Sequence, residues 1–600
     1  MSKFTDGLNS EQARAVTHAD GPLLILAGAG SGKTKTLTHR IAYLIGELKI
    51  FPSRILAVTF TNKAAKEMRQ RLAQILGEDS ENRQFMPWMG TFHSICVRML
   101  RMDGENIGLN KRFLIYDTDD QISLMKQIMK SRGLTDKDIK PRAVLSAISN
   151  AKNEMRNAED FSASTRGPRE QKIAELFFAY EKALKDTSAL DFDDLLIKTV
   201  ELLRSKPDIR HKWQQQFEHI LIDEYQDTNA VQYALIKLLV NSRRNLCVVG
   251  DDAQSIYSFR GADYTNILNF ERDFPGTTVV KLEQNYRSTG AILNMANALI
   301  SHNIHRTDKS LWTANGDGVE PKLWQLYNES EEALAIANEI QAQIANGRQY
   351  GDVAVLYRTN AQSYPIERAL RQSYIPYKIV GGLRFLDRAV VKDLLAYLRL
   401  LYQPSDRVSF LRIVNTPKRG VGAVSISKFL DWNDTSGKDI ISGLLAVEEA
   451  DTLTARAKRP LLEFGQKLHD LQQEIDGSPA ELIEKIMKST GYEDFINDGT
   501  PQAEERMENI GVLLSEAKAY VDVATFLEEM ALMSSTDTTA DQQVTLMTLH
   551  AAKGLEFPVV FLAGLEEGIL PHARVFDSGN ADDVEEERRL CYVGVTRARE

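Results

Sequence analysis

The sequence predicts an α/β fold in which a parallel sheet is interrupted by a domain-sized insertion. An apolar run at residues 22–26 leads into a glycine-rich loop and a helical pattern, and a second apolar run at 220–222 ends in two acids. Lys33 in the first motif and Asp223 in the second are 190 positions apart. Because a strand–helix–strand unit takes about 30 residues, we expect a segment of domain size between the two motifs.

The composition is that of an ordinary globular protein. A chain of 600 residues suggests about four domains. Its 43% hydrophobic and 26% charged residues argue against disorder, collagen-like repeats and a coiled-coil rod. The net charge of −10 argues against a protein that wraps DNA regardless of sequence, but it leaves room for a local basic face.

The sequence also gives expectations about location. No apolar run approaches the ~18 residues of a membrane-spanning helix, and the first residues lack an apolar signal segment. The three cysteines are too widely spaced for a disulfide framework or a zinc site. We therefore expect no membrane association and a location in the reducing cytoplasm.

The glycine-rich loop predicts a phosphate site. Backbone N–H groups of such a loop curl around phosphate oxygens, and the following helix adds the positive end of its dipole. In this pattern Lys33 holds the β- and γ-phosphates and Thr34 is a ligand of Mg²⁺. Alanine stands where the strict pattern begins with glycine. The loop consists of Ala27, Gly28, Ala29, Gly30, Ser31, Gly32, Lys33 and Thr34.

Polar side chains that follow two later apolar runs predict the remaining chemistry. Asp223 and Glu224 come after the run at 220–222, and Gln254 comes soon after the run at 246–250. The carboxyl ends of parallel strands meet at the edge of the sheet where ligands bind. We expect Asp223 to hold Mg²⁺, Glu224 to orient or deprotonate the attacking water, and Gln254 to sense the γ-phosphate.

Further motifs, in a fixed order, resemble those of the UvrD/PcrA/Rep branch of superfamily 1 DNA helicases, and within it the PcrA and UvrD subfamilies. The resemblance runs from residue 8 to residue 598 and therefore covers nearly the whole chain. In addition to the segments above it rests on residues 8–12, 58–65, 90–94, 223–229, 250–262, 285–288, 548–557 and 592–598.

The resemblance implies two RecA-like P-loop lobes with parallel sheets, each carrying an inserted, mainly helical domain. The first lobe is expected at 1–105 and 190–280, with its insertion at 106–189. The second lobe is expected at 281–379 and 545–600. Its insertion, at 380–544, opens after Gly381-Gly382 and is expected to contact duplex DNA.

The resemblance also implies roles around the nucleotide. Gln12 is expected to read the adenine edge, Tyr286 to stack on the adenine and Glu556 to accept from the ribose hydroxyls. Arg287 and Arg597 match the arginine fingers that neutralise charge developing on the γ-phosphate. Lys35 stands where relatives often carry arginine.

The resemblance further implies that single-stranded DNA crosses both lobes. Aromatic rings stack on bases regardless of sequence, while basic and polar groups hold the backbone. Phe259 stands where family members often carry tryptophan. The expected stacking residues are Phe60, Phe192, Tyr257 and Phe259. The expected strand contacts are Asn62, Thr91, His93, Arg260, Arg358 and Asn360. A glycine-bounded basic turn with Lys418, Arg419, Gly420 and Gly422 is expected to meet duplex DNA.

The resulting functional prediction is an ATP- and Mg²⁺-dependent DNA helicase and single-strand translocase that moves 3′ to 5′ in repair or replication. Expected partners are single-stranded DNA, junctions of single- and double-stranded DNA, and repair or replication proteins. The expected state is a monomer or a weak self-associate. Glu600 follows Arg597 by three residues where relatives continue, so we expect a fragment that lacks the last elements of the second lobe.

Three other classes of protein fit these motifs less well. A GTP switch needs an Asn-Lys-x-Asp motif, and the run Asn62-Lys63-Ala64-Ala65 lacks its aspartate. A motor subunit of a helicase–nuclease complex needs a C-terminal nuclease domain, for which the given chain has no room. A DNA-binding scaffold that does not hydrolyse ATP would not need the expected catalytic residues, all of which are present: Lys33, Asp223, Glu224, Gln254, Arg287 and Arg597. Translocation without productive unwinding stays open at this stage.

Overall fold

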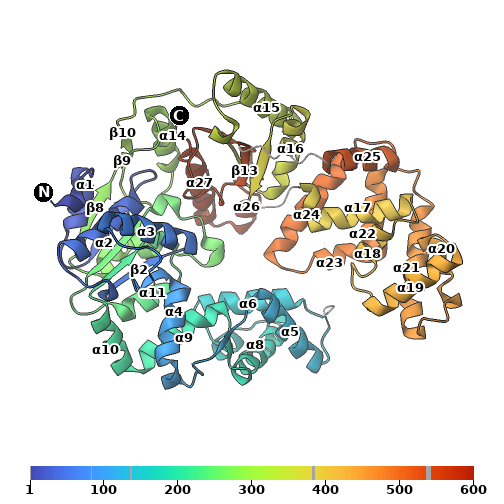
Figure 1. Ribbon diagram of the computed structural model, residues 1–600, viewed down its shortest axis with the longest axis horizontal. Coiled ribbons are helices and arrows are strands. Elements are labelled where there is room, and N and C mark those ends of the chain that lie inside the picture. The colour runs from blue at the N-terminus through green and yellow to red at the C-terminus, as the bar shows by residue number, and fades with distance from the viewer. Residues whose placement is uncertain (1, 83, 136–137, 382–384, 535–541) are drawn as a thin grey trace. The chain divides into compact units, whose positions relative to one another are not determined.

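The computed structural model describes residues 2–82, 84–135, 138–381, 385–534 and 542–600 (Figure 1). The chain forms two compact units, which we describe separately. The first unit comprises the chain up to Leu323 together with Ala552–Val560 and Leu565–Glu600. The second unit comprises Trp324–Ala551 and Phe561–Gly564.

The first unit is built on a six-stranded sheet with the order β3-β2-β6-β7-β1-β8. Each neighbouring pair in this order is parallel, so the carboxyl ends of the strands share one edge. The strands are β1 (Leu23–Ala27), β2 (Ile55–Thr59), β3 (Met89–Thr91), β6 (His219–Ile222), β7 (Leu246–Gly250) and β8 (Thr278–Leu282).

The central strands are almost entirely apolar and buried because helices cover both faces of this sheet. Alternate residues of β1 enter different cores: Leu24 and Leu26 join one hydrophobic cluster, while Leu23 and Ile25 join the other. Around the sheet lie α1 (Ser10–Thr17), α2 (Lys33–Gly46), α3 (Asn62–Leu76), α4 (Phe92–Asp103), α9 (Phe192–Ser205), α10 (Pro207–Gln216), α11 (Ala230–Leu239), α12 (Thr265–Leu268) and α13 (Phe270–Asp273).

A helical segment interrupts the first unit between α4 and α9 and has a hydrophobic cluster of its own. Two short parallel strands, β4 (Leu114–Ile115) and β5 (Ala189–Leu190), pair at its two ends. Its helices are α5 (Thr118–Ser131), α6 (Pro141–Asn153), α7 (Ala158–Ala163) and α8 (Pro168–Asp186). The helical character expected of residues 106–189 is therefore present.

Later parts of the chain complete the first unit. They add a two-stranded parallel pair, β9 (Gln284–Asn285) and β10 (Trp312–Thr313), and three helices, α14 (Gly290–Ile300), α26 (Arg574–Ser578) and α27 (Ala581–Val595). Residues 281–323 and 565–600 thus belong to the first compact unit, although the sequence analysis assigns them to the second lobe. The compact units and the expected lobes are different divisions of the chain, and the lobe limits stay a prediction.

The second unit contains a four-stranded sheet with the order β12-β13-β11-β14. The pairs β11–β13 and β12–β13 are parallel. Its strands are β11 (Val353–Tyr357), β12 (Tyr377–Val380), β13 (Val544–Thr548) and β14 (Val559–Leu562), of which β14 spans the border between the units. Two helices, α15 (Glu329–Ala345) and α16 (Ser363–Gln372), accompany the sheet.

The rest of the second unit is helical and has the largest hydrophobic cluster of the four described here. Of the expected hinge pair, Gly381 is described and Gly382 lies outside the described residues. The helices are α17 (Ala389–Tyr402), α18 (Arg407–Ile413), α19 (Ala423–Ser436), α20 (Ile440–Leu445), α21 (Ala455–Gln472), α22 (Pro479–Thr490), α23 (Tyr492–Ile496), α24 (Pro501–Ala517) and α25 (Val523–Ser534).

The predicted α/β fold class is confirmed: the first unit has a parallel six-stranded sheet, the second has a sheet that contains parallel pairs, and helices accompany both. Among the described residues, no helix combines the length and apolarity that crossing a bilayer would require.

Candidate nucleotide and nucleic-acid sites

Glycine is required at two positions of the loop between β1 and α2. Gly30 and Gly32 have left-handed backbone angles, with φ of 65° and 82°. A Cβ atom at Gly30 would lie 2.6 Å from the Asn285 amide nitrogen and 2.9 Å from the Arg287 Cβ. Gly32 is the N-cap of α2 and provides no capping side chain, so the first N–H groups of the helix are suited to an anion.

The departure from the strict pattern at Ala27 has a structural explanation. Ala27 is the last residue of β1 and is completely buried in the core, so its methyl group does not enter the loop. At the next position a Cβ on Gly28 would overlap with Leu311. Ser31 closes the loop by donating from its hydroxyl to the Gly28 carbonyl at 2.8 Å.

Lys33 carries a buried ammonium group with unmet bonding capacity. Its Nζ makes no hydrogen bond to any described residue. The Glu224 carboxylate oxygen Oε2 lies 4.0 Å away, too far for a hydrogen bond. Buried donors are almost always paired in folded proteins. A phosphate oxygen within the loop would supply the missing acceptor, so the residues present fit a nucleotide.

The pKa values of the two adjacent acids at the end of β6 are shifted in opposite directions. Burial, reinforced by the negative charge of Glu224, raises the pKa of Asp223 to about 7. Burial opposes ionisation of Glu224 too, but the charges of Lys33 and Lys553 outweigh it and lower the pKa of Glu224. Two acids with separated pKa values can take different roles, one as a cation ligand and one as an ionised base.

Two arginines from distant segments reach this site. Arg597 donates to the Gln254 side-chain oxygen at 3.4 Å, and Arg287 donates to Glu556 at 2.6 Å and to the Thr596 carbonyl at 2.9 Å. Burial and then the positive charge of Arg287 lower the pKa of Arg597 to about 9. Buried like charges this close are unfavourable unless an anion joins them.

Lys553 is a member of the site to which the sequence analysis assigned no role. Its Nζ donates to Asp227 at 2.5 Å and to the Gln254 carbonyl at 2.8 Å, and lies 3.9 Å from Glu224. It also lies 5.0 Å from the ring centroid of Tyr257. The available signal was its place in the motif at 548–557, in which it is the sole basic residue apart from His550.

The residues expected around the base gather at one corner. Gln12 accepts from the Asn9 N–H at 3.1 Å and donates to the Ser31 carbonyl at 2.9 Å, so it joins α1 to the phosphate loop. Asn9 also donates to the Tyr286 hydroxyl at 2.8 Å. Lys35 donates to the Gly7 carbonyl at 2.8 Å. Both oxygens of Glu556 bond arginines, Arg287 and Arg599.

Five of the expected DNA contacts line one open hollow of about 440 Å³ in the first unit. They come from the residue after β2, from the end of β3 and from the first turns of α3, α4 and α9. The His93 and Phe192 rings meet edge to face, with centroids 5.9 Å apart. Burial lowers the pKa of His93, which favours the neutral form of its imidazole. These contacts are Phe60, Asn62, Thr91, His93 and Phe192.

A second aromatic pair lies on the segment that follows Gln254. The Tyr257 and Phe259 rings have centroids 6.0 Å apart, and Phe259 is 65% exposed. This segment includes the short helix η6 (Ser258–Arg260). The side chain of Arg260 lies outside the described part of the chain.

The expected DNA contacts of the second unit are partly engaged within that unit. Asn360 donates to Glu505 on α24 at 2.7 Å, and the Arg358 N–H donates to Gln362. The Arg419 guanidinium lies against the Phe464 ring and donates to the carbonyl of Ile413, the last residue of α18, at 2.7 Å and to that of Pro417 in its own turn at 3.2 Å. Arg419 therefore turns inward, whereas Lys418, Gly420 and Gly422 of the same turn are exposed.

Two family models together match nearly the whole chain. The model of the UvrD/REP helicase N-terminal domain matches residues 8–275, and that of the UvrD-like helicase C-terminal domain matches residues 280–600. The chain therefore belongs to the UvrD/REP helicase family, as its motifs predicted.

Among individual proteins, the chain is similar to several that are named ATP-dependent DNA helicase PcrA. Those of Leuconostoc citreum and Bacillus subtilis are each 46% identical over 616 aligned residues. The protein of Staphylococcus epidermidis is 42% identical over 611 residues. Each alignment covers 100% of this chain and, in that order, 81%, 82% and 83% of the relative.

Proposed function

We propose that this family member is an ATP-dependent DNA helicase and single-strand translocase that moves 3′ to 5′ during DNA repair or replication. The observation that carries the proposal is that side chains from four other motifs gather at the phosphate loop and its lysine. The residues of these motifs lie within one compact unit: Lys33, Glu224, Gln254, Arg287 and Arg597. The buried Lys33 ammonium there has no hydrogen-bond partner among the described residues, and the buried Arg597 lies near the like charge of Arg287.

The substrate on this proposal is ATP with Mg²⁺. Thr34 and Asp223 would hold the ion, since hydroxyl and carboxylate oxygens are the ligands Mg²⁺ prefers. When bound, the ion would neutralise charge on the β- and γ-phosphates. The Lys33 ammonium contacts the same oxygens, and the ionised Glu224 accepts the proton of the attacking water.

The remaining polar groups act as charge develops. Gln254 contacts the γ-phosphate, and Arg287 and Arg597 neutralise its oxygens in the transition state. Gln12 and Tyr286 hold the adenine. Release of Glu556 from Arg287 would free a carboxylate for the ribose.

The nucleic-acid partner on this proposal is single-stranded DNA at a junction with a duplex. Phe60 and Phe192 stack bases in the hollow of the first unit, while Asn62, Thr91 and His93 hold the strand. Tyr257 and Phe259, with Arg260, continue the path, and Arg358 and Asn360 serve the second unit. The turn at 415–422 contacts the duplex through Lys418 and its exposed backbone, with Arg419 holding its shape.

Some properties of the chain are proposed on the resemblance alone. They are the lobe limits given above, contacts with repair or replication proteins, and a monomeric or weakly self-associating state. Each is open to direct test by limited proteolysis, pull-down with defined proteins and sedimentation.

The test compares ATP hydrolysis with and without oligo(dT), and then unwinding of duplexes that carry a 3′ or a 5′ single-stranded tail. We expect hydrolysis to rise with oligo(dT) and unwinding to require the 3′ tail. The Lys33→Ala variant is the control and should bind oligo(dT) without hydrolysing ATP. Unwinding confined to the 5′-tailed duplex would overturn the polarity, and hydrolysis indifferent to DNA would overturn the motor function.

A further inference from the structure

We propose that Glu586 is a positioning residue through which α27 couples DNA at the Tyr257–Phe259 segment to the Gln254–Arg597 contact. The inference rests on the proposed function, because it assumes that DNA stimulates ATP hydrolysis. It concerns a helix that ends two residues before Arg597 and whose own turns have no role in the site described above.

One face of α27 runs from the aromatic segment to the nucleotide site. Glu586, Arg589 and Val593 are spaced by three and four residues, which places them on a single face of α27. Arg597 lies two residues beyond the helix, and its Nε donates to the Val593 carbonyl at 2.8 Å. At 1.5 Å per residue, this face extends about 14 Å from Glu586 to the end of the helix at Val595. Arg589 and Val593 are buried, so the face is packed rather than solvated.

At one end this face holds the aromatic segment. The Ser258 N–H donates to Glu586 at 3.1 Å, and the Ser258 hydroxyl donates to the other oxygen of the same carboxylate. Ser258 lies between Tyr257 and Phe259, the two residues expected to stack on bases. Glu586 is thus a side chain of α27 that bonds the segment between these rings.

Arg589 bonds the same segment next to Gln254. Its Nε donates to the Ser255 carbonyl at 2.9 Å, and its guanidinium lies 4.6 Å from the ring centroid of Tyr264. Ser255 directly follows Gln254, whose side-chain oxygen accepts from Arg597 at 3.4 Å. Both ends of the stretch from Gln254 to Ser258 are therefore fixed to one helix.

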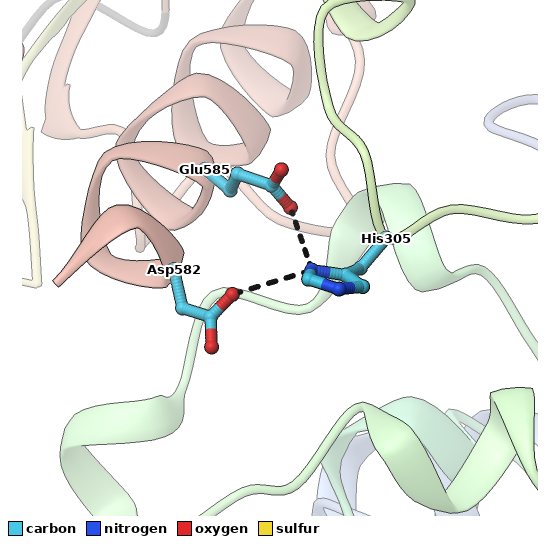
Figure 2. Close-up of side chains that lie close together, drawn as sticks. All are labelled: His305, Asp582 and Glu585. Carbon is cyan, nitrogen blue, oxygen red and sulfur yellow. Dashed lines mark ion pairs between the residues drawn. The ribbon is translucent and has the colours of Figure 1, made fainter.

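The first turn of α27 is anchored independently of this segment. His305 lies in the chain between α14 and β10, with its Nδ1 3.4 Å from Asp582 and 3.9 Å from Glu585 (Figure 2). Glu585 also accepts from the Ile304 N–H at 2.7 Å. We interpret this group as ion pairs rather than a metal site, because the guanidinium of Arg589 already lies 3.9 Å from Glu585.

A rigid helix anchored in this way passes a displacement from one end to the other. Packed elements respond to small shifts by moving as bodies rather than by deforming. When bases stack on Tyr257 and Phe259, a shift of Ser258 would move α27 through Glu586 and change how Arg597 meets Gln254 and the γ-phosphate. Without the Glu586 bond the aromatic segment would bind DNA but transmit less of the effect.

The test uses the full chain, four single variants and one double variant. Glu586→Ala removes both bonds to Ser258, while Glu586→Gln retains an acceptor for the N–H and a group that bonds the hydroxyl. Ser258→Ala removes the hydroxyl from the other side. Asp583→Asn is the matched control, because this acid of α27 accepts from Asn580 at the helix's own N-cap. Three quantities are measured: basal ATP hydrolysis, the Kd for oligo(dT), and kcat at saturating oligo(dT).

For Glu586→Ala we expect DNA-stimulated kcat to fall about tenfold, within the usual range of coupling between two sites. Basal hydrolysis and the Kd should stay within about twofold of the parent, and Glu586→Gln should restore most of the stimulation. Ser258→Ala combined with Glu586→Ala should cost no more than Glu586→Ala alone. A parent-like kcat in a folded Glu586→Ala variant, or equal losses in Glu586→Gln, would overturn the inference.

The outcomes separate the two proposals. If the parent chain shows no stimulation by oligo(dT), the proposed function fails before any variant is made. If the parent is stimulated and Glu586→Ala is stimulated equally, only the coupling through α27 fails. Melting curves of each variant identify a loss that comes from unfolding, in which case Glu586→Gln and Ser258→Ala decide the result.

Discussion

Phe192 offers a sharp test of the expected DNA path. Its ring is 49% exposed and lines the hollow next to His93, so truncation removes a stacking surface without opening the core. Stacking of a base on an aromatic ring is worth about 1–3 kcal/mol. At 1.4 kcal/mol per factor of ten, Phe192→Ala should weaken binding of oligo(dT) by about 5- to 150-fold.

The chain provides a matched control. Phe178, on α8, is 42% exposed and does not line the hollow, so Phe178→Ala should leave the Kd unchanged. Fluorescence anisotropy with labelled oligo(dT), repeated over a range of salt concentrations, measures both variants. Phe192→Ala should weaken binding by the same factor at each salt concentration, because it removes no cation that neutralises a phosphate.

Two results would refute this reasoning. Equal affinities of Phe192→Ala and Phe178→Ala would show that bases do not stack in this hollow. A reduced dependence of affinity on salt would show that the substitution disturbed ionic contacts instead of removing a stack.

Three further predictions concern catalysis, the first insertion and the basic turn. Glu224→Gln should lower kcat for ATP about 10²- to 10⁴-fold while ATP still binds, as single-turnover kinetics and equilibrium binding would reveal. Lys152→Met should destabilise the helical insertion by about 3–5 kcal/mol, because Asp191 and Asp194, each 2.7 Å from the buried ammonium, lose their partner. Burial raises the pKa of Asp194, and losing Lys152 raises it further, so stability present at low pH is lost as pH rises. Melting curves should therefore show a larger loss of stability for Lys152→Met at pH 8 than at pH 5. The control Lys185→Met, on α8, should show no loss at either pH. Arg419→Gln should weaken junction binding more than binding of oligo(dT), since it loosens the turn at 415–422, and equal losses on both DNAs would contradict that role.

The sequence by itself determined the parts of this protein whose chemistry is local. The phosphate loop, its lysine and the acids after β6 follow from short patterns, because a left-handed glycine or a buried strand end requires particular residues at adjacent positions. The alternation of β1 between two cores likewise follows from an apolar run that is covered on both faces. The ordered motifs were sufficient to predict the family.

Only the tertiary structure decided which distant side chains meet. Lys553 bonds Asp227 across 326 positions, and Glu586 bonds Ser258 across 328, separations at which no periodicity links the partners. From the sequence, Arg419 is expected to be an exposed phosphate contact. In the structure, its guanidinium bonds the carbonyl of Ile413 and packs on the Phe464 ring, so it faces inward. A short pattern fixes the backbone and its nearest neighbours, but the partner of a long, charged side chain depends on which elements the fold packs beside it.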